Sequence, residues 1–139
     1  MKITVVGAGY VGLVTSTGLA ATGHDVTCVD RDKAKIDTID AGQVPFHEPG
    51  LEELMKQQRA AGRLRASTDL AGSLAGSAVS IIAVGTPSNA QGIDLTHIRE
   101  AARGIARLLR SLGQYHVVTV KSTVVPTTTD TVVRRELEE

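Results

Sequence analysis

Short apolar runs alternate along this chain with longer segments whose apolar residues recur at helical spacing. The runs cover residues 2–6, 25–29, 63–67, 78–84 and 116–121. Runs of this length, rich in β-branched residues and bounded by turn residues, predict strands, and the segments between them predict helices. The continuous apolar run at 78–84 is typical of a strand that is buried on both faces of a parallel sheet.

The segments between the runs predict helices and loops. Helices are expected before Gly23, over residues 32–41, from Leu51 to Gly62, over residues 69–76 and from Thr127 onward. Loops are expected at 43–49 and 88–94, where polar and turn-forming residues gather. Asp94 or Thr96 is expected to cap the helix that follows the second loop.

The longest helical pattern covers residues 96–112 and has a clear apolar face. That face carries Ile98, Ala102, Ile105, Leu109 and Leu112. It should therefore pack against the sheet. The opposite stripe consists of Arg99, Arg103, Arg107 and Arg110. Such a stripe indicates a solvated face, with a docking surface for a partner as the alternative.

The alternation of strand and helix predicts an α/β fold with a doubly wound parallel sheet of the three-layer Rossmann type. We expect strand order 3-2-1-4-5, in a single domain over residues 1–139. Ligands of such sheets bind outside the carboxyl ends of the strands. Glycine and polar residues follow four predicted strands there, at Gly7, Asp30, Gly85 and Ser122.

The segment Gly7-Ala8-Gly9-Tyr10-Val11-Gly12 follows the first predicted strand and predicts a phosphate-binding turn. Gly7 permits a tight turn off the strand. Gly9 leaves space for a pyrophosphate to approach the backbone, and Gly12 lets the helix pack closely. The helix N-terminus offers N–H groups and partial positive charge, so the phosphates need no lysine. This pattern is typical of a dinucleotide site.

Asp30 ends the second predicted strand, where a carboxylate accepts hydrogen bonds from the adenosine ribose. Such a charge-assisted bond contributes about 1.5–3 kcal/mol. The 2′-phosphate of NADP would meet a like charge, at a cost of about 4 kcal/mol for one charge pair roughly 4 Å apart. Arg31 would instead favour NADP, because arginine binds 2′-phosphates in other proteins. The sequence predicts NAD, with Arg31 over the adenine or in solvent.

Composition narrows the class of partner. The chain has 15 basic and 15 acidic residues and an aromatic content of 2%, so neither nucleic acid nor an anionic membrane is expected. No membrane span or signal peptide is expected. Cys28, the single cysteine, lies in an apolar run, so we expect a core residue in a reducing cytoplasm. The scattered histidines predict no metal site.

Beyond the glycine turn, the chain resembles the NAD-binding domain of the UDP-glucose/GDP-mannose dehydrogenase family in five further segments. These segments are residues 28–30, 48–52, 62–64, 84–87 and 121–124. The matches come in order and span essentially the whole chain. The resemblance implies that the 6-hydroxyl of a nucleotide sugar, of the UDP-glucose or GDP-mannose type, is oxidised to a carboxylate with two NAD.

The resemblance also implies residue roles. The backbone of Tyr10 and Val11 would contact the pyrophosphate, and Asp30 with Lys35 would bind the adenosine ribose. Thr123, at the nicotinamide end, would orient an active-site water and is the one catalytic candidate. The cofactor-binding positions are then Gly7, Gly9, Tyr10, Val11, Gly12, Asp30, Arg31, Lys35, Val84, Gly85, Thr86 and Thr123. The alternatives are a solvated lysine at 35 and threonines that only cap turns.

Two further positions carry structural expectations. Glu48 is interpreted as an acid that supports the N-terminus of the following helix. Thr127 takes the place of a family glycine after Pro126. It is an acceptable N-cap, but it lacks the freedom of glycine at positive φ, which would alter a nicotinamide pocket formed there.

The resemblance implies that the catalytic cysteine and its lysine and asparagine partners belong to a later, sugar-binding domain. Because the sequence stops within a helical pattern at Glu139, we expect a truncated enzyme that binds NAD weakly without turnover. An unpaired edge at residues 116–121 predicts self-association, and a homo-oligomer is expected. The alternatives are a freestanding NAD-binding regulatory module and a fragment of a β-hydroxyacid-type dehydrogenase.

Overall fold

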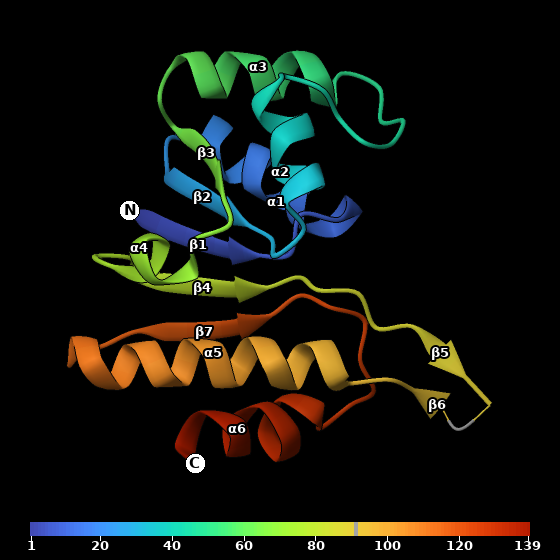
Figure 1. The fold of residues 1–139 in the computed structure, drawn as a ribbon, viewed down its shortest axis with the longest axis vertical. Coiled ribbons are helices and arrows are strands. Elements are labelled where there is room, and N and C mark those ends of the chain that lie inside the picture. The colour runs from blue at the N-terminus through green and yellow to red at the C-terminus, as the bar shows by residue number, and fades with distance from the viewer. Residues whose placement is uncertain (91) are drawn as a thin grey trace.

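The computed structural model describes residues 1–90 and 92–139. Five parallel strands form the central sheet in the order β3-β2-β1-β4-β7 (Figure 1). Their bounds are β1 Lys2–Val6, β2 Asp25–Val29, β3 Leu64–Ser67, β4 Val79–Ile82 and β7 Val117–Val120. This arrangement confirms the predicted doubly wound α/β fold and its 3-2-1-4-5 order.

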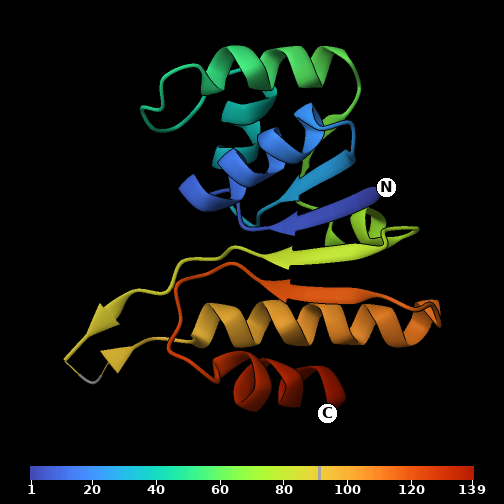
Figure 2. The same cartoon turned by 180° about the vertical axis from the view of Figure 1, so that it is seen from behind.

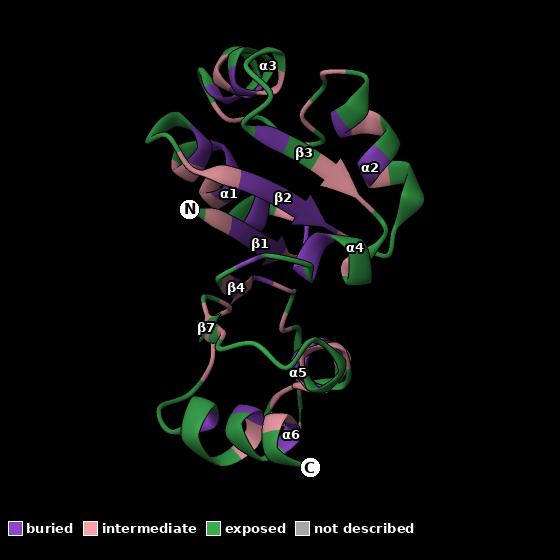
Figure 3. Ribbon diagram, turned by 90° about the vertical axis from the view of Figure 1, so that its left-hand side faces the viewer, coloured by how far each residue is buried: buried purple, intermediate pink, exposed green. Residues whose placement is uncertain are grey.

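Helices connect the strands and flank the sheet. They are α1 Tyr10–Ala21, α2 Lys33–Asp40, α3 Leu51–Ala60, α4 Leu70–Leu74, α5 Thr96–Leu112 and α6 Arg134–Glu138. The middle strands β1 and β2 are largely buried between them (Figure 3). Among the described residues, no helix is both long enough and apolar enough to cross a membrane.

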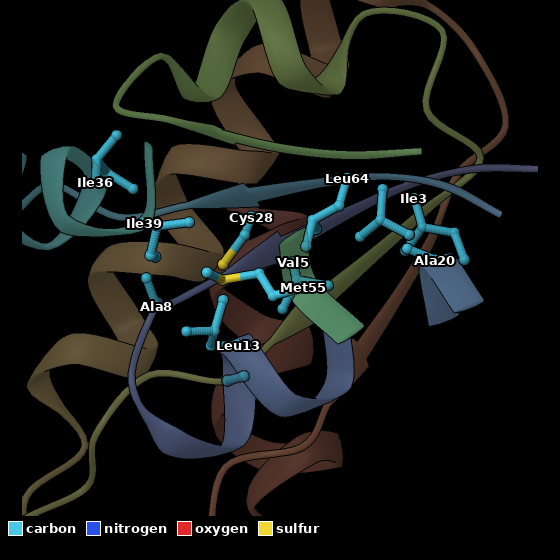
Figure 4. Packing of buried hydrophobic residues seen from close by; sticks show 12 residues of the cluster. Ile3, Val5, Ala8, Leu13, Ala20, Cys28, Ile36, Ile39, Met55 and Leu64 are labelled. Carbon is cyan, nitrogen blue, oxygen red and sulfur yellow. The ribbon is translucent and has the colours of Figure 1, made fainter. Parts of the chain in front are cut away.

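The hydrophobic core consists of two clusters. One joins β1, β2 and β3 to α1, α2 and α3, and Figure 4 shows Leu13, Cys28 and Met55 packed within it. The other joins β4 to α4, α5 and the C-terminal segment through Ile82 and Ile105. On the predicted apolar face of α5, Ile98, Ala102 and Ile105 are buried and Leu109 is partly buried. Leu112 is 39% exposed, so the prediction was wrong for this residue.

The segment before α5 differs from the prediction. Instead of a simple loop, residues 88–93 contain a short antiparallel pair, β5 Ser88–Asn89 and β6 Gly92–Ile93, which extends away from the body in Figures 1 and 2. Gln91, within the predicted loop, lies outside the described residues. The N-cap of α5 is Leu95, so the prediction of Asp94 or Thr96 as the cap was wrong. Asp94, one residue earlier, still accepts a hydrogen bond from the Thr96 N–H through Oδ1 at 2.8 Å.

The arginine stripe of α5 is not a uniformly solvated face, so that interpretation was wrong for two of its members. Arg99 Nη1 donates to Glu136 Oε1 at 2.6 Å, and Arg103 Nη2 donates to the same oxygen at 3.1 Å. Arg103 Nε also pairs with the second oxygen of Glu136. The Glu136 side chain is 2% exposed. This network fastens α6 to α5.

The C-terminal segment begins with a π-helical turn, η1 Thr129–Val133, before α6. The sequence suggested Thr127 as the N-cap of this segment, and this prediction was wrong. The N-cap is Thr128, and Thr127 has φ +74°, the one positive φ of a non-glycine residue in the described part of the chain. A threonine thus holds a backbone conformation that favours glycine.

Candidate functional site

A crevice of about 400 Å³ lies at the carboxyl ends of β1, β2 and β4. It is lined by Val6, Gly7, Gly9, Val29, Asp30, Arg31, Lys35, Thr68, Leu70, Ala83, Val84, Gly85, His97, Glu100 and Ala101. Seven of the predicted cofactor-binding residues are among them. The crevice therefore lies where open parallel sheets bind their ligands.

The three glycines of the first turn meet different constraints. Gly7 has φ +112°, and a Cβ there would lie 2.5 Å from the carbonyl oxygen of Ala83. A Cβ on Gly12 would lie 1.7 Å from the carbonyl oxygen of Gly7. At Gly9, by contrast, no described atom lies within 4 Å of such a Cβ. The fold itself requires glycine at 7 and 12, whereas the space beside Gly9 is left open toward the crevice.

Helix α1 points its N-terminus at this open space. It begins at Tyr10 with Gly9 as N-cap, and no described side chain caps it. The first helical hydrogen bond runs from the Leu13 N–H to the Gly9 carbonyl at 2.9 Å. The N–H groups of the first turn and the positive end of the helix dipole are thus available to an anion.

Asp30 is fixed by the backbone around it. Its Oδ2 accepts from the Ala8 N–H at 2.8 Å, and its Oδ1 accepts from the Asp32 N–H at 2.9 Å. Lys35 Nζ lies 3.7 Å from Oδ2. The carboxylate is 12% exposed and borders the crevice. Each oxygen has a second acceptor direction, so a ribose hydroxyl has a preoriented partner.

Arg31 is largely exposed to solvent and forms an ion pair. Its Nη1 lies 2.9 Å from Oε2 of Glu100, which belongs to α5. The two side chains are 73% and 52% exposed. This ion pair crosses from the end of β2 to the helix that packs beside β4.

Tyr10 is held by the loop that follows α2. Its hydroxyl donates to Glu48 Oε2 at 2.6 Å, and its ring lies 5.0 Å from the Phe46 ring. The hydrogen bond to the Glu48 carboxylate raises the pKa of Tyr10. The prediction for Glu48 was wrong: its acid holds Tyr10 instead of capping α3, whose N-cap Gly50 has no side-chain cap among the described residues.

Thr86 and Thr123 come together at the ends of β4 and β7. Thr86 Oγ1 donates to the Thr123 carbonyl at 2.7 Å. Like Tyr10, Val11 and Gly12, these two threonines are not part of the crevice lining, whereas Val84 and Gly85 are. The predicted residues thus form one group around the turn and Asp30 and a second group beyond Gly85.

Eight lining residues were not among the predicted cofactor-binding positions: Val6, Val29, Thr68, Leu70, Ala83, His97, Glu100 and Ala101. Three of them follow each other at helical spacing at the start of α5. His97 Nδ1 lies 3.3 Å from the Gly85 carbonyl, which joins α5 to the turn after β4. That spacing of three and four residues was the available signal, since it places these side chains on one face of the helix.

Cys28 lies beneath the site as a core residue, as predicted. It is fully buried, and burial raises the pKa of its thiol to about 11. A thiol with this pKa is protonated at neutral pH and is a poor nucleophile. Within the described residues, no group of three or more His, Cys, Asp and Glu side chains could hold a metal ion.

Comparison with known proteins identifies the family. The NAD binding domain of the UDP-glucose/GDP-mannose dehydrogenase family matches residues 1–139. The chain belongs to this family. Its cofactor is therefore NAD, as predicted from Asp30, and the match favours neither a freestanding NAD-binding regulatory module nor a fragment of a β-hydroxyacid-type dehydrogenase.

Individual relatives agree. The chain is 44% identical over its full length to a GDP-mannose 6-dehydrogenase of Pseudomonas syringae, and 48% identical over 96% of its length to a UDP-glucose 6-dehydrogenase of Rhizobium meliloti. It covers 32% and 30% of those proteins. The chain thus spans about a third of the length of the curated relatives that it matches.

Solved structures show the same fold. A ternary complex of GDP-mannose dehydrogenase from Pseudomonas aeruginosa matches with a TM-score of 0.95 and 44% identity, over 99% of this chain and 32% of that one. A UDP-glucose dehydrogenase from Pyrobaculum islandicum matches with a TM-score of 0.93 and 37% identity, over 98% of this chain and 32% of that one.

Proposed function

We propose that this chain forms the cofactor-binding part of a nucleotide-sugar 6-dehydrogenase. The enzyme would oxidise the 6-hydroxyl of a UDP-glucose or GDP-mannose type sugar to a carboxylate. The observation that carries the proposal is the pairing of two features in one crevice. Gly9 leaves an open space at the start of α1, and the Asp30 carboxylate is fixed beside it.

The charges that face the crevice support the binding of the cofactor there. The pyrophosphate would bind the first-turn N–H groups at Tyr10 and Val11, where the helix end carries partial positive charge. The adenosine ribose would donate its hydroxyls to Asp30, with Lys35 beside it. The central part of the cofactor would lie along Val84, Gly85 and Thr86, and its nicotinamide end would lie at Thr123.

The chemistry divides between the cofactor and the protein. NAD, when bound, accepts a hydride, and the oxidation of an alcohol to a carboxylate releases four electrons as two hydrides. One molecule of water supplies the second oxygen, so two NAD are consumed and three protons are released. We propose that Thr123 orients that water and that the residues of the crevice hold the cofactor in register.

We propose that NAD is preferred to NADP because the Asp30 carboxylate borders the site of the adenosine ribose. A 2′-phosphate would have to enter beside a carboxylate whose orientation is fixed by two backbone N–H groups. The repulsion costs about 4 kcal/mol for one charge pair at an effective dielectric near 20. The ribose hydroxyl instead gains a charge-assisted hydrogen bond.

Calorimetric titration of NAD into the chain and into Asp30→Asn tests the proposal. The variant should bind NAD about 10- to 150-fold more weakly, which corresponds to a loss of about 1.5–3 kcal/mol. The chain alone, given NAD with UDP-glucose or GDP-mannose, should form no NADH. A crystal soaked in saturating NAD that shows an empty crevice would refute the placement of the cofactor.

The coding sequence after residue 139 also tests the proposal. A continuing frame with a cysteine-bearing domain would support the dehydrogenase, and a stop codon directly after residue 139 would contradict it. For the whole protein we propose a homo-oligomer in the cytoplasm. Nucleotide sugars are expected in that compartment, and its reducing conditions keep the Cys28 thiol free.

A further inference from the structure

The ribose end of the crevice holds four charged side chains in two pairs. Asp30 is paired with Lys35 at 3.7 Å, and Arg31 is paired with Glu100 at 2.9 Å. All four side chains line the crevice. The charges are balanced, so each cation that could attract a phosphate already has a carboxylate partner.

Arg31 is the cation with the greater capacity to bind a phosphate. It follows Asp30 directly at the end of β2, and its guanidinium presents several N–H donors in one plane, which matches the geometry of a phosphate. The partner that holds it comes from elsewhere in the fold. Glu100 lies on α5, beyond β4, and it reaches Arg31 across the crevice.

We propose that Glu100 is a specificity-determining residue that disfavours NADP. It pairs with Arg31, so the guanidinium is less available to a 2′-phosphate. Discrimination against the 2′-phosphate then comes from two elements of the fold. This inference depends on the proposed placement of the adenosine ribose at Asp30.

The exposure of the pair limits the size of the effect. Both side chains are more than half exposed, so water and salt screen their attraction. Arg31 can therefore exchange Glu100 for a phosphate at modest cost. Removing the Glu100 charge should raise affinity for NADP by about fivefold, with the gain largest at low ionic strength.

The test is calorimetric titration of NAD and NADP into the wild-type chain and Glu100→Gln at low salt. The variant should bind NADP about fivefold more tightly and NAD within about twofold of wild type. Glu138→Gln is the matched control. It removes the same charge from another exposed Arg–Glu pair, Arg134–Glu138 at 2.7 Å, and should change neither affinity.

A double variant tests whether Arg31 causes the gain in NADP affinity. In Arg31→Ala/Glu100→Gln the gain for NADP should disappear, because no guanidinium remains to bind the 2′-phosphate. The same comparison in an Asp30→Ser background removes the stronger repulsion and makes NADP binding easier to measure.

The outcomes separate the two levels of the proposal. If wild type binds no NAD, the proposed function fails and this inference fails with it. If NAD binds normally but Glu100→Gln leaves NADP affinity unchanged, only the inference is overturned. A gain that persists without Arg31 also overturns it, since the freed arginine would then not be the cause.

Discussion

At the scale of single residues, Gly9 and Gly12 separate the requirements of function from those of folding. Gly9→Ala should leave the stability within about 0.5 kcal/mol of wild type, because the added methyl meets open space. The same methyl would occupy the position of the pyrophosphate, so NAD affinity should fall by about tenfold or more. Thermal unfolding and calorimetric titration measure the two quantities.

Gly12→Ala is the matched comparison. Its methyl would lie 1.7 Å from the Gly7 carbonyl oxygen, a distance that no small adjustment relieves. This variant should unfold or express as insoluble protein. Equal behaviour of the two variants in both assays would contradict the assignment of different roles.

Thr127 carries strain that glycine would remove. At φ +74° an L-residue costs roughly 1–2 kcal/mol, and glycine loses part of this gain through its greater freedom in the unfolded chain. Thr127→Gly should therefore raise the free energy of unfolding by about 0.5–1 kcal/mol in urea. Thr128→Gly, at φ −53° and with its Oγ1 bonded to the Val125 carbonyl at 2.8 Å, should lower it.

Tyr10 reports on its contact with Glu48. The Glu48 carboxylate accepts a hydrogen bond from the Tyr10 hydroxyl, which favours the protonated phenol and so raises the pKa of Tyr10. Glu48→Gln should shift this pKa downward. The chain has two tyrosines and no tryptophan, so a Tyr115→Phe background leaves one phenol to follow by ultraviolet absorbance. An unchanged titration midpoint would mean that the bond does not persist in solution.

At the scale of elements, the attachment of α6 to α5 depends on Glu136. Bonds from Arg103 and Arg99 lower its pKa below the usual value of 4.5. The unfolded chain then binds more protons than the folded chain in acid, so stability is fully present above the unfolded pKa and declines as pH falls through the folded one.

Wild type should accordingly lose thermal stability more steeply than Glu136→Gln as the pH falls below about 4.5. The variant should melt several degrees lower at neutral pH, because it leaves two arginines without their carboxylate. Parallel melting curves from pH 3 to 7 measure both effects. Parallel slopes in the two proteins would show that Glu136 is not the group that titrates.

The sequence predicted the elements best where the pattern was local. The bounds of β1 and β2 were obtained directly, because β-branched runs between a turn and an acid admit few alternatives. The β5–β6 pair was missed because two-residue strands carry too little pattern to distinguish from a loop. The arginine stripe was misinterpreted because Glu136, which pairs with two of its members, comes from a helix more than 30 residues later.

The residues of the candidate site were also predicted best where the sequence pattern was local. Gly7, Gly9 and Asp30 belong to one continuous strand-turn-helix-strand unit, so their spacing revealed them. Glu100 and His97 were missed because their helical spacing shows only that they share one face of α5, and it is the crossing of α5 past the sheet that brings that face to the crevice. The local sequence pattern thus predicts the side of the crevice formed by residues 7–35. The side formed by α5 depends on the tertiary fold.

At the scale of the whole molecule, β7 forms an edge of the sheet. Among the described strands it pairs with β4 alone, and Tyr115 and Val117 beside it are exposed. Free edges recruit other chains. The chain should therefore exceed its monomer mass of 14.6 kDa in light scattering as concentration rises. Val117→Lys should reduce this association. A constant monomer mass in wild type would contradict the prediction.

The division of the core into two clusters has a consequence for ligand-linked stability. The clusters meet along the pairing of β1 with β4, and the crevice draws its walls from both sides of that line. A dinucleotide bound there would contact both parts of the core, so separating the two parts would also release the dinucleotide. Saturation at about 100 times the dissociation constant adds roughly 2.7 kcal/mol against any opening that releases it.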